Sequence, residues 1–129
     1  MSKSETNSND KNQNSKPYDL EDRTFEFARS VRAFVKKLRK SVANIEDGKQ
    51  LIRASRSIGA NYIEANESLS KKDFIMRIKI CRKEAKESRY WLMLIDTDDK
   101  LEHENHKKQL VNEATELMNI FGAILAKSK

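Results

Sequence analysis

The stretch SKKDFIMRIKICRKEAKESRYWLMLI, residues 70–95, carries the clearest helical pattern in this chain. Apolar or small residues recur in it every three or four positions, which places them on one face of a helix. These seam residues are Phe74, Ile78, Cys81, Ala85, Ser88, Leu92 and Ile95. So strict an alternation is typical of a helix lying nearly parallel to another. Ser70 precedes the pattern and Asp73 follows three residues later, so we expect Ser70 to cap this helix.

Three further helical segments are predicted around this one. The first spans about residues 19–40, and Asp47-Gly48 is a turn signal that separates it from a second helix over residues 51–68. A fourth helix spans about residues 105–127, after an acidic stretch at 96–106 that reads as a connection or a frayed helix start. Because the connections are short and no strand-like alternation competes, we predict an all-α, antiparallel up-down four-helix bundle.

The second helix contains Gly59, one of only three glycines in the chain. A glycine inside a helix costs about 1 kcal/mol relative to alanine. Ser55 and Gly59 lie one turn apart on the inner side, so we expect a neighbouring helix to approach closely there.

Two polar residues flank this small-residue seam, and periodicity does not explain them. We predict that Asn61 and Glu64 bond to groups on the helix of residues 70–95, such as Glu87 or Arg89. Their role would be to specify the register of the two helices.

Composition limits the compartment and the partners. Residues 1–17 have no large apolar side chain after Met1, which predicts a disordered polar tail ahead of a bundle over residues 18–129. The chain holds 26 Lys and Arg against 20 Asp and Glu, and its pI of about 9.4 is compatible with a polyanionic partner. With Cys81 as the single cysteine and no apolar leader, we expect a soluble cytoplasmic protein without a membrane partner.

The sequence offers little that could carry catalysis. It lacks a glycine-rich phosphate loop and a nucleophile elbow, which favours a non-enzymatic protein without a cofactor. His103 and His106 stand among carboxylates, but their spacing matches no dedicated ligand motif, and we predict a solvated connection, not a metal site. Cys81 lies in the apolar seam, where burial should raise the pKa of its thiol.

Basic residues form two helical stripes. Residues 71–90 contain eight Lys or Arg and three acids, and one stripe lies about 100° round from the apolar seam. It consists of Lys79, Arg82, Lys86 and Arg89, and a similar stripe on the first helix consists of Arg29, Arg32, Lys36 and then Arg39 or Lys40. The two could flank one groove and meet successive phosphates of a nucleic acid. The alternative is a solvated face with intrahelical Glu–Lys pairs, and the two interpretations are about evenly supported.

Other faces are too apolar to be fully solvated. Opposite the basic stripe, residues 70–95 align Ile80, Glu84, Glu87, Trp91 and Leu94, and the fourth helix has two apolar stripes. This is more apolar surface than one bundle needs, so we expect a homo-oligomer.

The stretches SIGANYIEA, SKKDF and KESRYWLMLI also carry a family resemblance. The chain resembles the four-helix-bundle family of 23S ribosomal RNA intervening-sequence proteins over about residues 20–127. It is more distantly similar to the accessory variability determinant proteins of diversity-generating retroelements. The matching positions are Ser57, Ile58, Ala60, Asn61, Glu64, Asp73, Phe74, Glu87 and Leu92. The chain departs at Gly59, where the family commonly has Pro, and at Ala65, where it commonly has Gly.

The resemblance implies an up-down bundle in a homopentameric ring, without known catalytic activity, and a nucleic-acid-binding accessory role beside a reverse transcriptase. Together with the stripes, it predicts binding of the RNA or DNA backbone by seven residues: Arg29, Arg32, Lys36, Lys79, Arg82, Lys86 and Arg89. The competing hypothesis is a homo-oligomeric protein–protein scaffold that does not bind nucleic acid and presents its tail or its Trp91 face to a partner protein.

Overall fold

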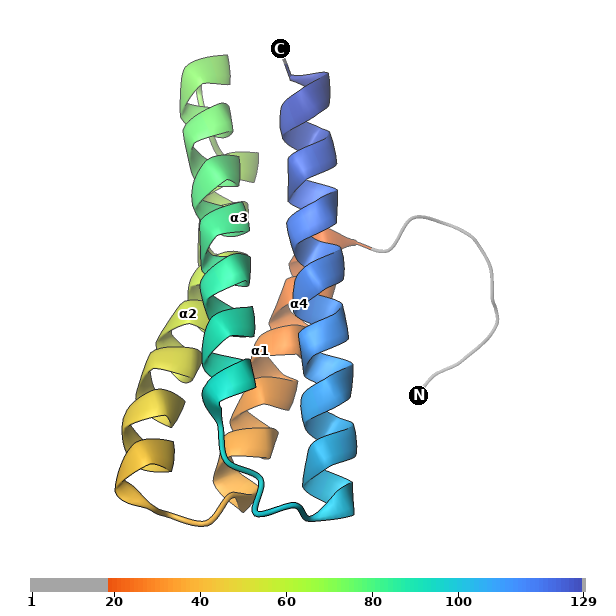
Figure 1. The fold of residues 1–129 in the computed structure, drawn as a ribbon. Helices are drawn as coiled ribbons and strands as arrows, with labels where there is room; N and C mark the ends of the chain where they lie inside the picture. Colours follow the sequence, from red (N-terminus) through yellow and green to blue (C-terminus); the bar gives the residue numbers. More distant parts are fainter. Residues whose placement is uncertain (1–18, 129) are drawn as a thin grey trace.

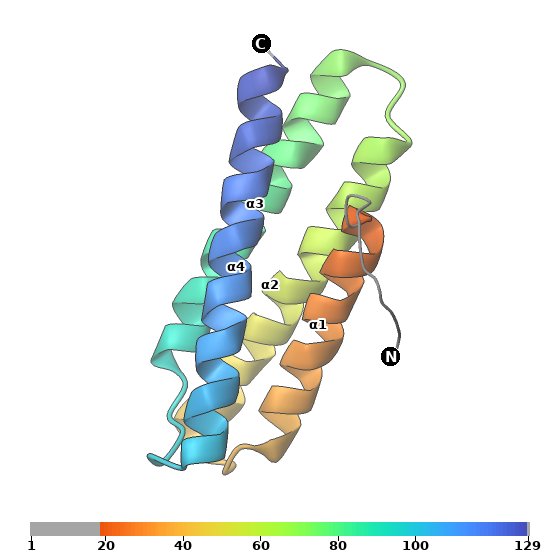
Figure 2. The ribbon, with the colours of Figure 1, turned by 90° about the vertical axis from the view of Figure 1, so that its right-hand side faces the viewer.

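The computed structural model describes residues 19–128 and contains four α-helices in this range (Figure 1). They are α1 (Leu20–Lys37), α2 (Val42–Asn66), α3 (Lys71–Leu94) and α4 (Leu101–Lys127). Each helix packs against the next in the chain, α1 and α4 share a shorter seam, and α1 lies diagonally opposite α3. The turned view shows α3 and α4 on one side of the bundle and α1 and α2 on the other (Figure 2). The predicted four-helix bundle is confirmed, whereas the predicted tail of residues 1–17 lies outside the described residues.

Side-chain caps fix where three of the helices begin. Asp19 accepts a hydrogen bond from the backbone N–H of Glu21 at the start of α1, at 3.0 Å. The predicted cap of α3 is confirmed, because the Ser70 hydroxyl oxygen accepts a hydrogen bond from the N–H of Asp73 at 3.1 Å. Ser41 caps α2 in the same way. Each cap satisfies a backbone donor that the first turn of a helix leaves without an intrahelical acceptor.

The predicted turn at Asp47-Gly48 is wrong. α2 already begins at Val42, and Gly48 lies inside it as a buried residue. A Cβ atom at Gly48 would lie 3.1 Å from Cγ1 of Val35, so glycine here allows α1 to pack closely on α2. The chain reverses instead over residues 38–41, just ahead of the Ser41 cap.

The fourth helix also begins earlier than predicted, at Leu101 instead of about residue 105. Asp98 and Asp99 have φ angles of 56° and 58°, which is the left-handed region that ends regular helix geometry. Glu102 and Glu104 then fall in the first turn of α4, where negative charge is favourable. The acidic stretch is therefore divided between a short connection and a helix start.

The core contains the seam read from residues 70–95. Its residues from Ile78 to Ile95 are buried, and Phe74 is half-buried against them. One of the two apolar stripes predicted for the fourth helix joins this core, and its buried residues are Leu110, Ala114, Leu117 and Phe121. Within residues 19–128, no helix is both long enough and apolar enough to cross a membrane.

Asn44 joins the α1–α2 and α3–α4 connections. Both connections lie at the lower end of the bundle in Figure 1. Its amide Nδ2 donates to the carbonyl oxygens of Arg39, at 3.0 Å, and Asp96, at 2.9 Å. Its Oδ1 accepts from the N–H of Asp96 at 3.0 Å. One buried side chain thus couples the α1–α2 connection to the α3–α4 connection.

Candidate nucleic-acid interface

The two basic stripes lie on opposite sides of the bundle. Arg29 and Arg32 line a groove between α1 and α2. On α3, Arg82 lies against α4, since its Nε would be 3.9 Å from a Cβ atom built on Gly122. The expectation that both stripes flank one groove is therefore not met within one chain, because α1 and α3 are diagonal partners.

The carboxylates of α3 turn away from the cations of the same helix. Glu87 accepts a hydrogen bond from Nη2 of Arg53 in α2 at 3.0 Å, and an oxygen of the buried Glu84 lies 3.7 Å from the same nitrogen. Both acids therefore face the same arginine of α2. The intrahelical pairs that would turn the basic stripe into an ordinary solvated face do not form with these two residues.

Most cations of the predicted site are exposed and have no ionic partner among the residues that the structure describes. Among residues 19–128, neither a hydrogen bond nor an ion pair engages the side chains of five of them: Arg32, Lys36, Lys79, Arg82 and Lys86. Arg29 is exposed and lies 3.5 Å from Glu26 one turn away, a contact that is weak in water. These six residues can offer their charge to an external anion.

Arg89 differs from the other six. It is half-buried, and its Nη1 donates to the hydroxyl oxygen of Thr115 on α4 at 3.3 Å. The structure thus places it at the α3–α4 seam, partly withdrawn from the surface that Lys79 and Lys86 share.

The polar residues predicted to set the helix register behave unequally. Asn61 does bond to α3, but its Oδ1 accepts from Nη1 of Arg77 at 2.9 Å and not from the expected partners. The prediction for Glu64 is wrong, because its side chain is exposed and bonds to no described residue. Glu87 does link the two helices, through Arg53.

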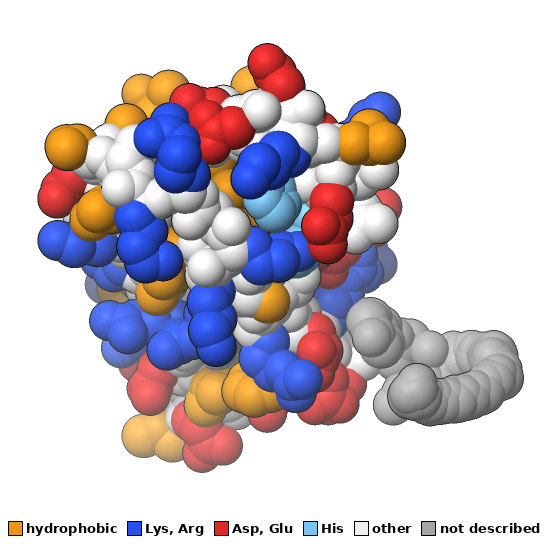
Figure 3. All heavy atoms as spheres, turned by 90° about the horizontal axis from the view of Figure 1, so that it is seen from below, with side chains coloured by type: hydrophobic (Ala, Val, Ile, Leu, Met, Phe, Trp, Pro, Cys, Tyr) orange, Lys and Arg blue, Asp and Glu red, His pale blue; other side chains and the backbone are white. Residues whose placement is uncertain are grey.

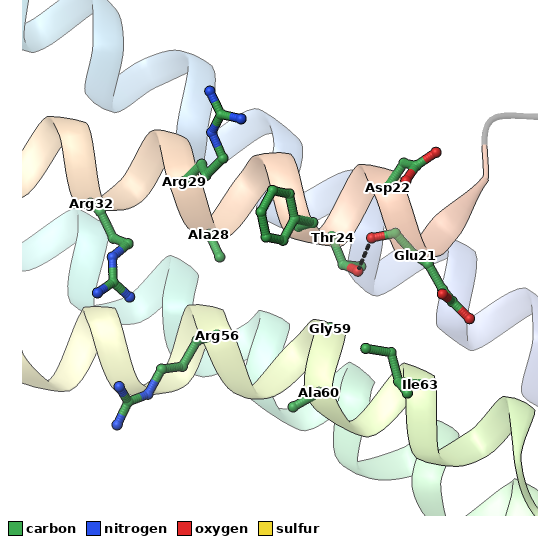
Figure 4. A pocket seen from close by; sticks show the side chains of 11 residues that line it. Glu21, Asp22, Thr24, Ala28, Arg29, Arg32, Arg56, Gly59, Ala60 and Ile63 are labelled. Carbon is green, nitrogen blue, oxygen red and sulfur yellow. Dashed lines mark hydrogen bonds between the residues drawn. The ribbon is translucent and has the colours of Figure 1, made fainter.

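The groove between α1 and α2 is a cleft with a cavity volume of about 570 Å³ (Figure 4). Small residues form part of its wall, namely Ala28 on α1 with Gly59 and Ala60 on α2. The predicted close approach at Gly59 is confirmed, since a Cβ atom there would lie 3.0 Å from Oγ1 of Thr24.

The sequence reasoning missed two residues of this cleft, Arg56 and Phe25. Arg56 stands three, four and seven positions before Gly59, Ala60 and Ile63, which is the spacing of one helix face. That spacing could have indicated an arginine beside the small-residue seam. Phe25 is 60% exposed, and its place two residues before the buried Phe27 puts it on the other side of the helix, a spacing that could have indicated an exposed aromatic ring.

The end of the bundle with the two interhelical connections also carries many cations, as Figure 3 shows. Several are paired with acids there. Arg39 forms two hydrogen bonds with Asp98, at 3.0 and 3.2 Å, and this pairing lowers the pKa of the Asp98 carboxyl. Lys37 lies 4.0 Å from Glu102. These contacts reduce the charge that Arg39 and Lys37 can offer to a polyanion.

The prediction that the two histidines lie in a solvated connection is wrong, because both stand inside α4, where His103 is buried and His106 is half-buried. His106 contacts Ser30 and Lys37 at 3.0 and 3.1 Å, and burial followed by the Lys37 charge lowers its pKa. Among residues 19–128, no three His, Cys, Asp or Glu side chains form a group that could hold a metal ion. Cys81 is buried, and burial raises its thiol pKa to about 12, as predicted.

The fold and its two cationic faces place this protein in the class of all-helical up-down bundles. A family model described as 23S rRNA-intervening sequence protein matches residues 17–123, so the chain belongs to that family. It is also similar to a solved structure from Bacteroides thetaiotaomicron VPI-5482, a protein with unknown function from the S23 ribosomal protein family. That likeness has a TM-score of 0.67 and 32% sequence identity, and it covers 83% of this chain and 98% of the other. No protein of curated function matches this sequence.

Proposed function

We propose that this protein binds the backbone of RNA or DNA through the exposed cations of α1 and α3 and catalyses no reaction. The observation that carries the proposal is the orientation of Glu84 and Glu87 toward Arg53, which leaves Lys79, Arg82 and Lys86 without acidic partners among the described residues. Cations at one-turn spacing along a rigid helix can meet successive phosphates and release their counterions. Such binding is independent of sequence and weakens steeply with salt.

The α1 and α3 faces contribute separately to nucleic-acid binding. Because the α1 and α3 stripes lie on opposite sides of one bundle, a single strand segment contacts one face at a time. We propose the α3 face as the principal backbone contact, since three of its four stripe residues are exposed without a partner in the described chain. The α1 face would bind a second segment or a neighbouring strand.

The test is a mobility-shift titration at about 50 and about 200 mM salt with the full chain. Reversing Lys79, Arg82 and Lys86 to glutamate should remove most of the affinity and leave only the weaker contact of the α1 face, while helicity and assembly stay unchanged. Neutralising the same residues to glutamine should lower the salt slope by roughly 2 to 3, because each lost phosphate contact removes about 0.7 to 0.9.

The control reverses three exposed lysines outside the stripes. They are Lys49, Lys100 and Lys108. This variant has the same net charge as the reversed α3 stripe, so it should keep most of the affinity if position matters. Equal losses in both variants would show that only net charge acts. Unchanged, salt-sensitive binding after reversal of the α3 stripe would show that the stripe is merely a solvated face.

We propose that the protein also self-associates in the cytoplasm, with five copies as the number that the family resemblance implies. The last turns of α3 expose Tyr90, Met93 and Leu94, at 58%, 62% and 50%. Apolar side chains gathered in this way are typical of protein contacts. Light scattering during size-exclusion chromatography measures the copy number, and a monomer at all concentrations would contradict self-association.

The same apolar surface supports the second candidate, a protein–protein scaffold that does not bind nucleic acid. Under that hypothesis, the wild-type chain should show no salt-sensitive binding to any oligonucleotide. An accessory role beside a reverse transcriptase is a further proposal, which rests on the family resemblance. Co-purification of the two proteins, tested with and without nuclease treatment, would check it.

A further inference from the structure

The cleft between α1 and α2 has two chemically different ends. In Figure 4, Arg32 and Arg56 lie toward one end, and Glu21 and Asp22 lie toward the other. Between them, the close crossing at Gly59 leaves a wall of very small side chains. A cleft of about 570 Å³ lies within the usual size range of small-ligand pockets.

The cationic end has the residues needed to hold a phosphate. Arg32 reaches from α1 toward α2, and Arg56 comes from α2 at the same end of the cleft (Figure 4). Neither guanidinium has a hydrogen bond or an ion pair with any residue from 19 to 128. Guanidinium groups bind phosphate oxygens with two parallel hydrogen bonds, so this end selects an anion with several acceptor oxygens.

The apolar part of the cleft suits a flat ring. Phe25 lines it and is 60% exposed, and Ile63 is 49% exposed. The guanidinium carbon of Arg29 lies 5.9 Å from the centroid of the Phe25 ring. An accessible aromatic ring beside an arginine is the combination on which unstacked nucleic-acid bases stack.

We propose that this cleft binds one nucleotide of a single-stranded nucleic acid, with its base against Phe25 and the small-residue wall and its phosphate on Arg32 and Arg56. Charge sets the orientation of the nucleotide in the cleft, because Glu21 and Asp22 repel phosphate from the opposite end. A base within a duplex is stacked and paired, so the cleft discriminates in favour of single strands. This inference rests on the proposed function and adds a ligand class to it.

The test fills the cleft without changing its charge. Ala60 is an exposed residue of α2 that lines the cleft, and Ala60→Leu would occupy the space of the base. Ala43→Leu is the matched control, because Ala43 is also an exposed alanine of α2 but lies outside this cleft. Both substitutions keep a good helix former at a surface position, so both variants should fold, which circular dichroism checks.

Fluorescence anisotropy then compares a labelled single strand of about 12 nucleotides with a duplex of about 20 base pairs at one salt concentration. Loss of one base–aromatic stack weakens binding by roughly tenfold. We expect Ala60→Leu to weaken single-strand binding by about that factor and duplex binding by less than about twofold. Ala43→Leu should change neither.

A covalent readout locates the strand directly. A single strand containing 4-thiouridine, irradiated on the wild-type protein, should crosslink to the peptides of α1 and α2 that border the cleft. Ala60→Leu should reduce this crosslink in proportion to the lost affinity.

The other outcomes each overturn the inference and are distinguishable. Unchanged single-strand affinity in Ala60→Leu, with binding otherwise intact, would leave the proposed function standing and remove the nucleotide site. Equal weakening for single strand and duplex would also remove it. If Ala60→Leu instead dissociates an oligomer in light scattering, without any crosslink at the cleft, its occupant is a second copy of the chain. If the wild-type chain binds neither strand type, the proposed function fails as well.

Discussion

Exchange of Gly59 for alanine tests the close approach of α1 to α2. The added Cβ atom would lie 3.0 Å from Oγ1 and 3.4 Å from Cβ of Thr24. Thr24 is fully buried, and its hydroxyl donates to the carbonyl oxygen of Leu20 at 2.7 Å, so it cannot move aside without breaking that bond. The helices must therefore separate slightly or Thr24 must leave its position.

Two opposing contributions set the expected change in the free energy of unfolding. Alanine is favoured over glycine inside a helix by about 1 kcal/mol. Overpacking a tight contact of this kind costs about 1 to 3 kcal/mol. We expect Gly59→Ala to lower the free energy of unfolding by about 1 kcal/mol net, which corresponds to a fall in Tm of about 4 °C for a domain of this size.

A double-mutant cycle isolates the contact. Thr24→Ala removes the hydroxyl that would lie 3.0 Å from the added Cβ atom and leaves the ordinary 3.4 Å contact with Cβ of residue 24. Gly59→Ala in that background should therefore stabilise the protein by about 1 kcal/mol. The coupling energy between the two positions is then about 2 kcal/mol. Urea unfolding followed by circular dichroism measures all four proteins. A stabilising Gly59→Ala in the wild-type background, with coupling below about 0.5 kcal/mol, would refute the close approach.

Three other predictions concern buried polar and titratable groups. Because burial and the Lys37 ammonium lower the pKa of His106, the folded state disfavours its protonation. The free energy of unfolding should therefore be highest above about pH 6.5, the pKa of an unfolded histidine, and should fall as the pH drops through the lower pKa of the folded state. His106→Gln should remove this pH dependence from urea-unfolding measurements. Asn44→Ala removes three side-chain hydrogen bonds, one to Arg39 and two to Asp96, and should lower the free energy of unfolding by about 3 kcal/mol. Asn44→Asp keeps only the acceptor for the Asp96 N–H and should lower it by a smaller amount, and urea unfolding measures both variants. The Cys81 thiol, buried with a pKa of about 12, should react with a thiol reagent only at the rate of bundle opening, and rapid labelling of the native protein would contradict its position.

The local signals in the sequence were sufficient for α3 but not for α2. The cap at Ser70 and the seam from Ile78 to Ile95 depend on neighbouring residues of one helix, so the pattern predicts them directly. Gly48 looked like a turn because aspartate and glycine favour turns. Its actual role depends on Val35 of α1, a contact between different helices that no local pattern contains.

The candidate site likewise has a part that the sequence predicts and a part that depends on contacts between helices. Periodicity predicts which cations share a helix face, and the exposure of Lys79, Arg82 and Lys86 agrees with it. Whether those cations are neutralised depends on Arg53 of α2, which takes up both carboxylates of α3 that could have paired with them. The register between α2 and α3 therefore decides the available charge.

The amino-acid sequence by itself determined four amphipathic helices, the apolar seam of α3 and the excess of positive charge, because each depends on residue type and spacing along one segment. Only the tertiary structure decided that the two basic stripes face opposite sides of the bundle. It also decided that Arg56 and Phe25 share a cleft with Arg32. The physical reason is that the rotation of one helix about its axis relative to its neighbours is set by packing across the core, as at the contact of Gly59 with Thr24.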